Sequence, residues 1–429
     1  MNLPMASIPA QLNRLGSAVI DQALLSGTNF VAGVLLIRHA GDRQYGYYVL
    51  ATSAVLLLTT LQNGFFGAPM INRLTPLPMP EQGRFVAGLN REQRSLLLPG
   101  FIACLVLAAA ARLLGLISNE ALGISAAFIV CALAMLNREF FRMVLLAHRR
   151  TEVILRTDLF FVAVFLAGIF LTLHSGGAGT GALLALGAAA LVAGMLLSSR
   201  ARRGGYISDA GQSGVLRQLA PVGAWAATGG AIHWIYGQGY SYLIAGTLDV
   251  TAVAAVSATR LLMMPLNLIS SGVTQLMLPT ASSWLHREGP AAVLRRLLWT
   301  GSAMCLLALC YFAGIWQLRG WIYGSLLHKG FADSDLLFCL WAGIFGLMVV
   351  RDQLLLLPVL RERFRTLAGL SLACAGIAVA LSYPAMHRYG AGGALVGMLV
   401  GEVLNIAGIA VLALREVRLG VVACVEAAV

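Results

Sequence analysis

The feature that most constrains this chain is a series of apolar runs, each long enough to cross a membrane. A membrane-spanning helix needs about 20 predominantly apolar residues. Because a helix satisfies its own backbone hydrogen bonds in lipid, such runs predict an all-α polytopic membrane protein. Roughly twelve runs meet this length requirement, at 17–37, 47–70, 96–115, 121–146, 153–173, 181–198, 219–245, 250–280, 297–317, 336–357, 366–385 and 391–414.

The composition agrees with a membrane protein and argues against several other classes. Charged residues make up 11% of the chain, whereas soluble domains carry about 25%. The net charge of +12 comes from short basic clusters between apolar runs, so we expect it to set topology and not to bind nucleic acid. The 7 cysteines lie mostly inside apolar runs without a C-x-x-C spacing, so we expect no metal site and no cofactor.

The basic residues predict the orientation of the chain. With the N-terminus in the cytoplasm, about 23 of the 30 Lys and Arg residues fall on the cytoplasmic side, about six fall outside, and Arg260 lies within a run. This bias follows the positive-inside rule. We therefore expect a multi-pass protein of the cell inner membrane with both termini in the cytoplasm.

The two halves of the chain repeat each other. The fourth run ends in NREFFRMVLLAHRR and the tenth in VRDQLLLLPVLRER, which aligns Arg138 and Glu139 with Arg351 and Asp352 at an offset of 213 residues (351 − 138). This repeat predicts two pseudo-symmetric six-helix bundles around a central cationic cleft. The predicted parts are an N-terminal lobe at 1–198, a cytoplasmic linker at 199–218 and a C-terminal lobe at 219–429.

Three segments resemble a known family. DQALLSGTNFVAGVLLIRHAGDRQYGYY, LQNGFFGAPM and REFFR…AHRR, all within residues 15–160, are similar to oligosaccharide flippases of the multidrug/oligosaccharidyl-lipid/polysaccharide exporter superfamily. The resemblance implies a two-lobed bundle that flips a polyprenyl-diphosphate-linked glycan outward across the inner membrane. The chain departs from two related branches of the superfamily. Lipid II flippases have two further spans beyond the twelve predicted here, and the multidrug branch favours acidic binding residues, whereas the clearest charge within a span of the second half here is basic.

Charged residues near the cytoplasmic ends of two runs are the first candidate site residues. Arg138, Arg142 and Arg351 stand beside acidic neighbours in otherwise apolar runs. One interpretation is that they are snorkelling anchors at the membrane surface. The functional interpretation is that they line the cytoplasmic mouth of the cleft, where a charged ligand enters.

Two carboxylates lie within apolar runs. Asp21 stands beside a polar face of the first run that includes Gln22 and Asn29, and Glu402 lies near the middle of the twelfth run. Neither has an obvious basic neighbour, and an intramembrane carboxylate is a functional candidate by default. We expect Asp21 or Glu402 to bind a coupling H+ or Na+, and Gln22 and Asn29 either to contact substrate or to pack helices together.

A basic residue marks the eighth run. Arg260 shares a helical stripe with Asn267 and Ser271, and Pro265 predicts a kink between them. A guanidinium presents a fork of donors that matches phosphate oxygens. We expect Arg260 to contact a diphosphate or an acidic sugar; the alternative is a buried structural ion pair.

Aromatic and polar residues share a face of the seventh run. His233, Tyr236 and Tyr240 are spaced at i, i+3 and i+7. Aromatic rings with hydroxyl groups suit sugar faces and edges, so these residues are candidate substrate contacts. The alternative is an interfacial belt, where tyrosine and tryptophan are common.

Together these features favour export of a lipid-linked oligosaccharide by alternating access. The chain has no Walker motif, so an ion gradient or mass action must drive it, and membrane lipids, a polysaccharide polymerase and chain-length machinery are the expected partners. The first alternative is an ion-coupled multidrug exporter of the same superfamily. A membrane-embedded glycan ligase or acyltransferase is less favoured, because the outer loops are short.

Overall fold

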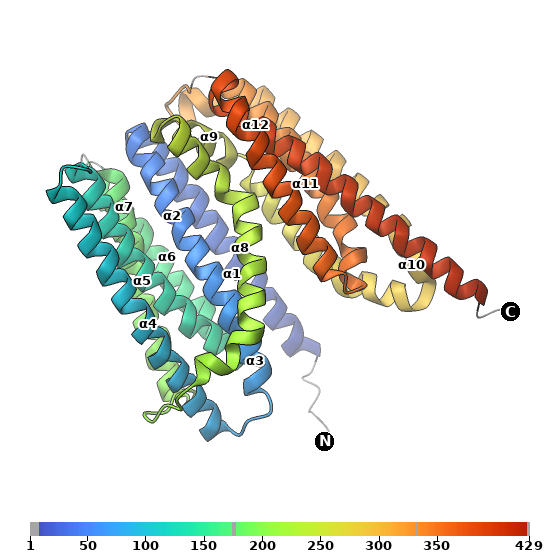
Figure 1. Cartoon of the computed structure of the whole chain (residues 1–429), viewed down its shortest axis with the longest axis horizontal. Helices are drawn as coiled ribbons and strands as arrows, with labels where there is room; N and C mark the ends of the chain where they lie inside the picture. The colour runs from blue at the N-terminus through green and yellow to red at the C-terminus, as the bar shows by residue number, and fades with distance from the viewer. Residues whose placement is uncertain (1–7, 174–176, 332, 427–429) are drawn as a thin grey trace. The chain divides into compact units, whose positions relative to one another are not determined.

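The computed structural model describes residues 8–173, 177–331 and 333–426, and these residues fold into helices joined by short connections (Figure 1). Nine helices in this part of the chain are long and apolar enough to cross a membrane by length and composition. The chain divides into two compact units, residues 1–234 and 235–429. The boundary lies inside one helix, whereas the predicted lobe boundaries around 199–218 stay a prediction.

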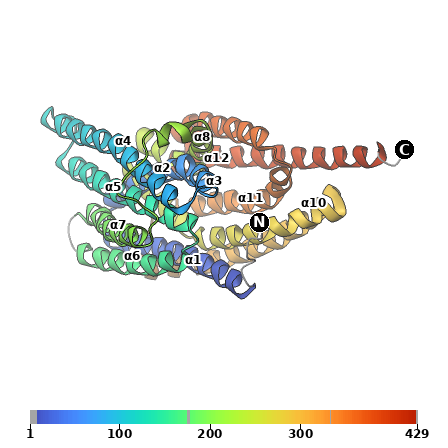
Figure 2. The same ribbon diagram turned by 90° about the horizontal axis from the view of Figure 1, so that it is seen from below.

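The first unit is a bundle in which α7 packs against both α5 and α6, α1 packs against α6, and α2 and α4 pack against α5 (Figure 2). A π-helical turn, η1, joins α2 to α3, so these three elements form a single span. The elements are α1 (Ile8–His39), α2 (Asp42–Gln62), η1 (Asn63–Gly67), α3 (Ala68–Leu74), α4 (Met79–Leu113), α5 (Asn119–Ala147), α6 (Thr151–Thr172) and α7 (Ala178–Arg203).

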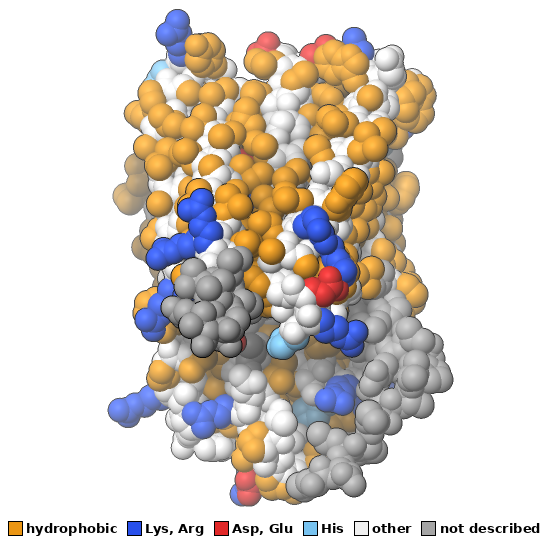
Figure 3. All heavy atoms as spheres, turned by 90° about the vertical axis from the view of Figure 1, so that its right-hand side faces the viewer, with side chains coloured by type: hydrophobic (Ala, Val, Ile, Leu, Met, Phe, Trp, Pro, Cys, Tyr) orange, Lys and Arg blue, Asp and Glu red, His pale blue; other side chains and the backbone are white. Residues whose placement is uncertain are grey.

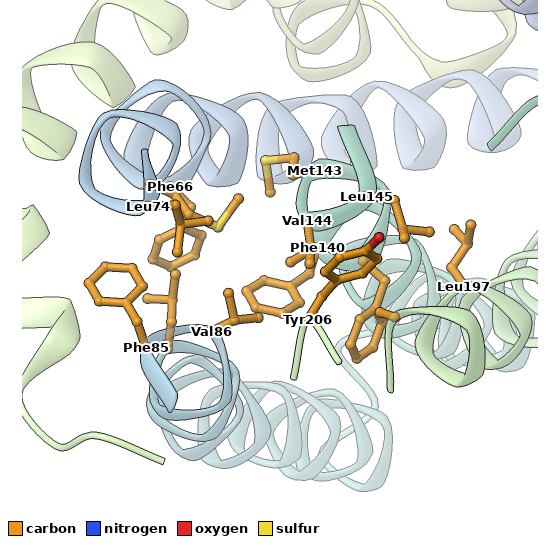
Figure 4. Packing of buried hydrophobic residues seen from close by; sticks show 14 of the residues in the cluster. Phe66, Leu74, Phe85, Val86, Phe140, Met143, Val144, Leu145, Leu197 and Tyr206 are labelled. Atoms are coloured by element: carbon orange, nitrogen blue, oxygen red, sulfur yellow. The ribbon is translucent and has the colours of Figure 1, made fainter. Parts of the chain in front are cut away.

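An aromatic core stabilises one end of this bundle. Phe85 of α4 and Phe140 of α5 are each at most 2% exposed, and they belong to a cluster that also includes Phe66, Met143 and Leu197 (Figure 4). Burying one such side chain contributes about 1.5–3 kcal/mol. The cluster therefore fixes the positions of α4 and α5 at the end where the charged residues of α5 lie.

The segment after α7 is held against α4. The backbone N–H groups of Ser208 and Gln212 donate to the carbonyl oxygens of Gly83 and Arg84 at 3.1 and 3.0 Å. The carboxylate of Glu92 accepts from the N–H of Leu216 at 2.6 Å, which caps the first turn of the next helix. The connection is thus fixed to the first unit at both of its ends.

The helix α8 (Val215–Thr247) contains the boundary between the units. Its first part belongs to the first unit, where the indole N–H of Trp234 donates to the carbonyl oxygen of Ser53 at 2.8 Å. The second unit continues with α9 (Val250–Leu261), α10 (Met264–Trp321), η2 (Ile322–Leu326), α11 (Ser334–Leu360) and α12 (Phe364–Glu426).

Two of these long helices are each interrupted by a glycine with positive φ. In α10 the break is at Gly289, with φ 79° and ψ 175°, and Pro290 follows it. In α12 the break is at Tyr389 and Gly390, where Gly390 has φ 56°. Glycine adopts such angles without the steric cost of a Cβ atom. Each interrupted helix therefore supplies two spans, which raises the nine helices to eleven spans. With α8, which at 33 residues is long enough to cross a membrane, the described part of the chain has the twelve spans that the apolar runs predict.

The two parts of α12 approach each other through a glycine face. A Cβ atom on Gly397 would lie 2.2 Å from Ser382 Oγ, and one on Gly401 would lie 2.8 Å from Ala378 Cβ. The sequence spacing of these glycines predicts such a close-packing face, and the contacts confirm it. The carboxylate of Glu402, the next residue, points away from this face toward α8 and α11.

The molecular surface fits an apolar surrounding. On the face shown in Figure 3, hydrophobic side chains form a broad band, and most Lys and Arg side chains gather below it. Many large apolar side chains are exposed, such as Leu107 at 67% and Leu171 at 86%. In water such exposure would favour aggregation, whereas lipid accepts it, so the protein is a multi-pass membrane protein.

Candidate functional site

Five charged side chains from three helices meet inside the first unit, and we call them the first charge network. Asp21 comes from α1, Asp158 from α6, and Arg138, Glu139 and Arg142 come from α5. Helix α5 places Arg138 and Arg142 one turn apart on the same face. Because α1 and α6 pack together, they bring both aspartates to these arginines.

Arg142 is the centre of the first charge network. Its Nη2 lies 2.5 Å from Asp21 Oδ2, its Nε lies 3.2 Å from Asp158 Oδ2 and its Nη1 lies 3.7 Å from Glu139 Oε1. Arg138 pairs with the other oxygen of Asp158, and its guanidinium carbon lies 4.1 Å from the centre of the Phe161 ring. Three carboxylates and two guanidiniums leave one net negative charge if all are ionised.

The second span contributes two amide side chains beside this network. Gln62 Nε2 donates to the carbonyl oxygen of Leu136 at 2.9 Å, and Asn63 Nδ2 donates to Glu139 Oε1 at 3.3 Å. Asn63 begins the π-helical turn η1, and π-turns occur frequently at functional sites. The LQNGFFGAPM segment therefore connects the second span to the charged face of α5.

A smaller set of polar side chains meets inside the second unit, and we call it the second charge network. Arg351 Nη1 lies 2.9 Å from Glu402 Oε1, and Arg351 Nη2 lies 2.8 Å from Asp352 Oδ1. The hydroxyl of Tyr236 donates to Glu402 Oε2. Two carboxylates and one guanidinium again leave one net negative charge if all are ionised.

Asp21 and Glu402 have no basic neighbour within their own runs, but each pairs with an arginine from another helix. Asp21 pairs with Arg142, which is 121 residues away in the sequence, and Glu402 pairs with Arg351, which is 51 residues away. Both partners come from other helices, so a search within one run could not find them.

The expectation that Arg138 and Arg351 face an open vestibule also needs correction. Arg138 is 3% exposed and Arg351 is 9% exposed, so both are enclosed by their own units. Arg138 pairs with Asp158 on α6, whereas Glu139 lies near Arg142 one turn further along α5. The side chain of Arg142 is 24% exposed, which makes it the most accessible arginine of the two networks.

Arg260 lies near the end of α9 with neutral partners only, in the part of the chain that the structure describes. Its Nη1 donates to Gln238 Oε1 at 2.8 Å and to the Tyr240 hydroxyl at 3.4 Å. Its guanidinium carbon lies 5.6 Å from the centre of the Tyr240 ring and 5.5 Å from that of Trp341. This half-buried cation retains its full charge for a further ligand.

The predicted stripe of Arg260 with Asn267 and Ser271 is interrupted. Helix α9 ends at Leu261 and α10 begins at Met264, so the two parts no longer share one helical face. Asn267 is exposed and Ser271 is half-buried. Pro265 lies in the first turn of α10, where a proline is tolerated because its missing N–H has no partner within the helix.

The remaining candidates fall into different places. On α1, Asp21 is buried, whereas Gln22 and Asn29 are exposed on another side of the helix. On α8, His233 is exposed, Tyr236 joins the second charge network, and Tyr240 contacts Arg260. The predicted set of three residues on α8 therefore serves different neighbours.

Sequence reasoning missed several residues of these sites. Asp158 is completely buried within the fifth apolar run, so the rule that singled out Asp21 applies to it equally. For Gln62 and Asn63, the only sequence signal is that they lie within the LQNGFFGAPM segment. The contribution of Trp341 to the Arg260 site has no sequence signal, because a tryptophan in a span is common.

Comparisons with known proteins identify the fold. No family model matches the sequence, and no curated protein matches it. Among solved structures, the chain is similar to the lipid II flippase MurJ in an inward closed conformation, with a TM-score of 0.75, 10% identity, and coverage of 93% of this chain and 86% of that chain.

Multidrug transporters share the same fold. An inward-facing MATE family transporter of the MOP superfamily matches with a TM-score of 0.66, 13% identity, and coverage of 92% of this chain and 94% of that chain. The eukaryotic MATE transporter AtDTX14 matches with a TM-score of 0.60, 10% identity, and coverage of 96% and 98%. The chain thus has the MOP superfamily fold, and the proteins that share it here are transporters and not enzymes.

Proposed function

We propose that this protein moves a polyprenyl-diphosphate-linked oligosaccharide from the inner to the outer leaflet of the cytoplasmic membrane by alternating access. The fold is one that a lipid II flippase uses, and the sequence motifs of the first half resemble those of oligosaccharide flippases. The lipid tail stays in the bilayer while the diphosphate and the glycan cross through the protein. The exported glycan then serves a polymerase and its chain-length machinery.

The observation that carries the proposal is the unpaired charge of Arg260. Arg138, Arg142 and Arg351 each contact a carboxylate, whereas the described partners of Arg260 are an amide oxygen, a hydroxyl and two aromatic rings. A charge inside a span costs about 2.5–3.5 kcal/mol on insertion scales. An anionic ligand offsets that cost, and a diphosphate presents oxygens in the geometry that a guanidinium fork binds.

The surroundings of Arg260 suit a ligand that carries sugars. The hydrogen bond that Arg260 donates to Gln238 Oε1 and the two ring faces orient the guanidinium without neutralising it. Tyr240 is buried against it, and His233, Asn267 and Ser271 of the C-terminal lobe are further proposed contacts for hydroxyl groups. In the N-terminal lobe, the exposed Gln22 and Asn29 and the partly exposed Arg142 are the proposed substrate contacts, whereas the enclosed Arg138 and Arg351 serve the charge networks.

The two charge networks are the proposed coupling sites. Each has one carboxylate more than it has guanidiniums, and Asp21 Oδ1 is buried without a hydrogen-bond partner among the described residues. Binding of H+ or Na+ at Asp21 or Glu402 removes the excess negative charge. We propose that this neutralisation changes which conformation of its lobe is favoured and so couples an ion gradient to transport.

Multidrug export is the second candidate function, because MATE transporters share the fold. An organic cation needs an acidic contact, and the described acids of the spans near these sites are already paired with arginines. Arg260 repels a cation. The charge at this position therefore favours an anionic substrate.

The test of the proposal is a set of substitutions at Arg260. We expect Arg260→Ala to lose most glycan export, Arg260→Lys to retain part of it because the charge stays, and Arg260→Glu to be the most defective because it repels the anion. Export is measured by complementation of a glycan-export defect and normalised to the amount of protein in the membrane.

The matched control is Arg319→Ala. Arg319 also lies over a tryptophan ring, at 4.2 Å from Trp316, but pairs with Asp335 at 3.7 Å. This variant should export normally. If Arg260→Ala also exports normally at wild-type abundance, Arg260 is a structural residue and the proposal loses its main support.

The proposed orientation has its own test. Reporters fused near Gly205 and Glu288 should lie in the cytoplasm, and reporters near Gly177 and Gly330 should lie outside, because the basic residues gather near the first pair. Reporter activity on each side of the membrane is the measurement. A cytoplasmic reporter at Gly330 would contradict the proposed topology.

A further inference from the structure

A cavity of about 240 Å³ lies between α4 and α5 in the first unit, and its lining includes no residue of the first charge network. Its lining comes from one face of each helix. Helix α4 supplies Asn90, Gln93, Arg94, Leu97 and Leu98, and helix α5 supplies Leu133, Leu136, Asn137 and Phe140. These spacings of three and four residues are those of single helical faces, so the two helices form the walls of one groove.

The lining is polar at one end and apolar at the other. Asn90, Gln93 and Arg94 precede the point at residue 96 where the apolar run of α4 begins, and Leu97 and Leu98 follow it. On α5, Asn137 lies at the polar end, since its Oδ1 accepts a hydrogen bond from Arg94 Nη2 at 3.0 Å. The groove therefore crosses from the level of lipid headgroups to the level of acyl chains.

Two side chains at the polar end retain unused hydrogen-bonding capacity. Gln93 is 5% exposed, and its Oε1 is buried without a hydrogen-bond partner among the described residues. A buried amide oxygen without a hydrogen-bond partner destabilises the protein, which indicates a missing donor. Arg94 uses one described hydrogen bond, to the neutral Asn137, so its charge is available to an anion.

We propose that this groove binds a membrane phospholipid with an anionic, hydroxyl-bearing headgroup of the phosphatidylglycerol class. Arg94 binds the phosphate, a headgroup hydroxyl donates to Gln93 Oε1, and an acyl chain lies along Leu97, Leu98 and Leu133. Basic pockets between spans are known settings for anionic lipid headgroups. This lipid site is independent of the proposed transport function, because it needs only the protein and a bilayer.

The experiment measures lipid bound to the purified full-length protein by native mass spectrometry. The probes are phosphatidylglycerol, phosphatidylcholine of the same acyl chains, and soluble glycerol phosphate. We expect phosphatidylglycerol to bind in preference to phosphatidylcholine, and glycerol phosphate alone to bind weakly because it lacks the acyl chains. Equal binding of phosphatidylglycerol and phosphatidylcholine overturns the proposal.

Three variants locate the site. Arg94→Gln should weaken phosphatidylglycerol binding roughly tenfold, which is the effect of losing one charged hydrogen bond. Arg91→Gln is the matched control, because Arg91 is exposed on the same helix but does not line the cavity, and it should bind normally. Equal losses in the two variants indicate general attraction to the basic surface and overturn the proposal.

The third variant tests the hydroxyl contact. Gln93→Leu removes the unsatisfied oxygen without charge, so it should reduce the preference for phosphatidylglycerol over phosphatidylcholine while unfolding at the same or a higher temperature. An unchanged preference removes Gln93 from the site. A polyprenyl phosphate that displaces phosphatidylglycerol at equal mole fraction assigns the groove to the lipid-linked substrate and overturns the phospholipid proposal.

Discussion

The two charge networks use similar parts in different numbers. In the first network Arg142 contacts three carboxylates, and Asp158 is shared by two arginines. In the second network Arg351 contacts two carboxylates, one of them its own neighbour, and Glu402 has a tyrosine hydroxyl as its other partner. The first network is therefore redundant, whereas the second depends on single contacts.

This difference in the number of ion-pair partners predicts that the first charge network tolerates the loss of one charged side chain better than the second. Removal of one partner of a buried ion pair costs more than the pair contributes, because it leaves an uncompensated charge. In the first network, Arg142 remains paired when one carboxylate is lost, because two of its three carboxylate partners are still present. In the second network the loss of Glu402 leaves Arg351 with Asp352 alone, and the loss of Arg351 leaves both carboxylates without a cation.

The largest effect is expected at Arg351. Arg351→Met should destabilise the protein by about 3–5 kcal/mol, because Glu402 is 1% exposed and keeps an unpaired charge. Thermal unfolding in detergent measures the change. The double variant Arg351→Met, Glu402→Leu should recover most of the loss, and a double variant as unstable as the single one would contradict the ion-pair explanation.

An intermediate effect is expected at Tyr236. Tyr236→Phe removes only the hydroxyl that donates to Glu402, and a hydrogen bond to a charged group contributes about 1.5–3 kcal/mol. The same unfolding measurement applies. Tyr383→Phe, in the same unit at an exposed position, is the control and should unfold like the wild type, because its ring contact with His387 is kept.

The smallest effect on stability is expected at Asp21. Asp21→Asn should cost about 1 kcal/mol or less, since Arg142 keeps Asp158 and Glu139 and is partly exposed. Transport into vesicles should nevertheless lose its dependence on the ion gradient if Asp21 is the coupling site.

A matched comparison separates the two candidate coupling sites. Glu402→Gln neutralises the second network in the same way, so the gradient dependence of the two variants shows which unit carries coupling. Unchanged dependence in both variants would remove Asp21 and Glu402 from the mechanism. A loss of stability at Asp21 as large as at Arg351 would show that the first network is not redundant.

The sequence predicts the spans well because their signal is local. The length and apolarity of each run depend on consecutive residues, and most predicted runs correspond to one helix or to one part of an interrupted helix. The second run comprises α2, η1 and part of α3, and the eighth comprises α9 and the first part of α10. The glycine face of the twelfth run is also predictable, since its period of four residues is a property of one helix.

The partners of the charged residues are not local and could not be predicted in the same way. Arg142 and Asp21 meet only because α1, α5 and α6 pack together, and no periodicity records that packing. The interruption between α9 and α10 lies just before Pro265, where the sequence predicts a kink. Asp158 is a carboxylate inside an apolar run like Asp21, so the same rule applies to it.

The sequence order of the second network has a consequence for how the chain is synthesised. The ribosome delivers α11, with Arg351, before the second part of α12, with Glu402. Arg351 therefore enters the bilayer with Asp352 as its available acid, and it gains its second partner only when the second part of α12 is inserted. The glycine face then packs this part of α12 against the part made just before it, so the Arg351–Glu402 ion pair is a late step of membrane insertion.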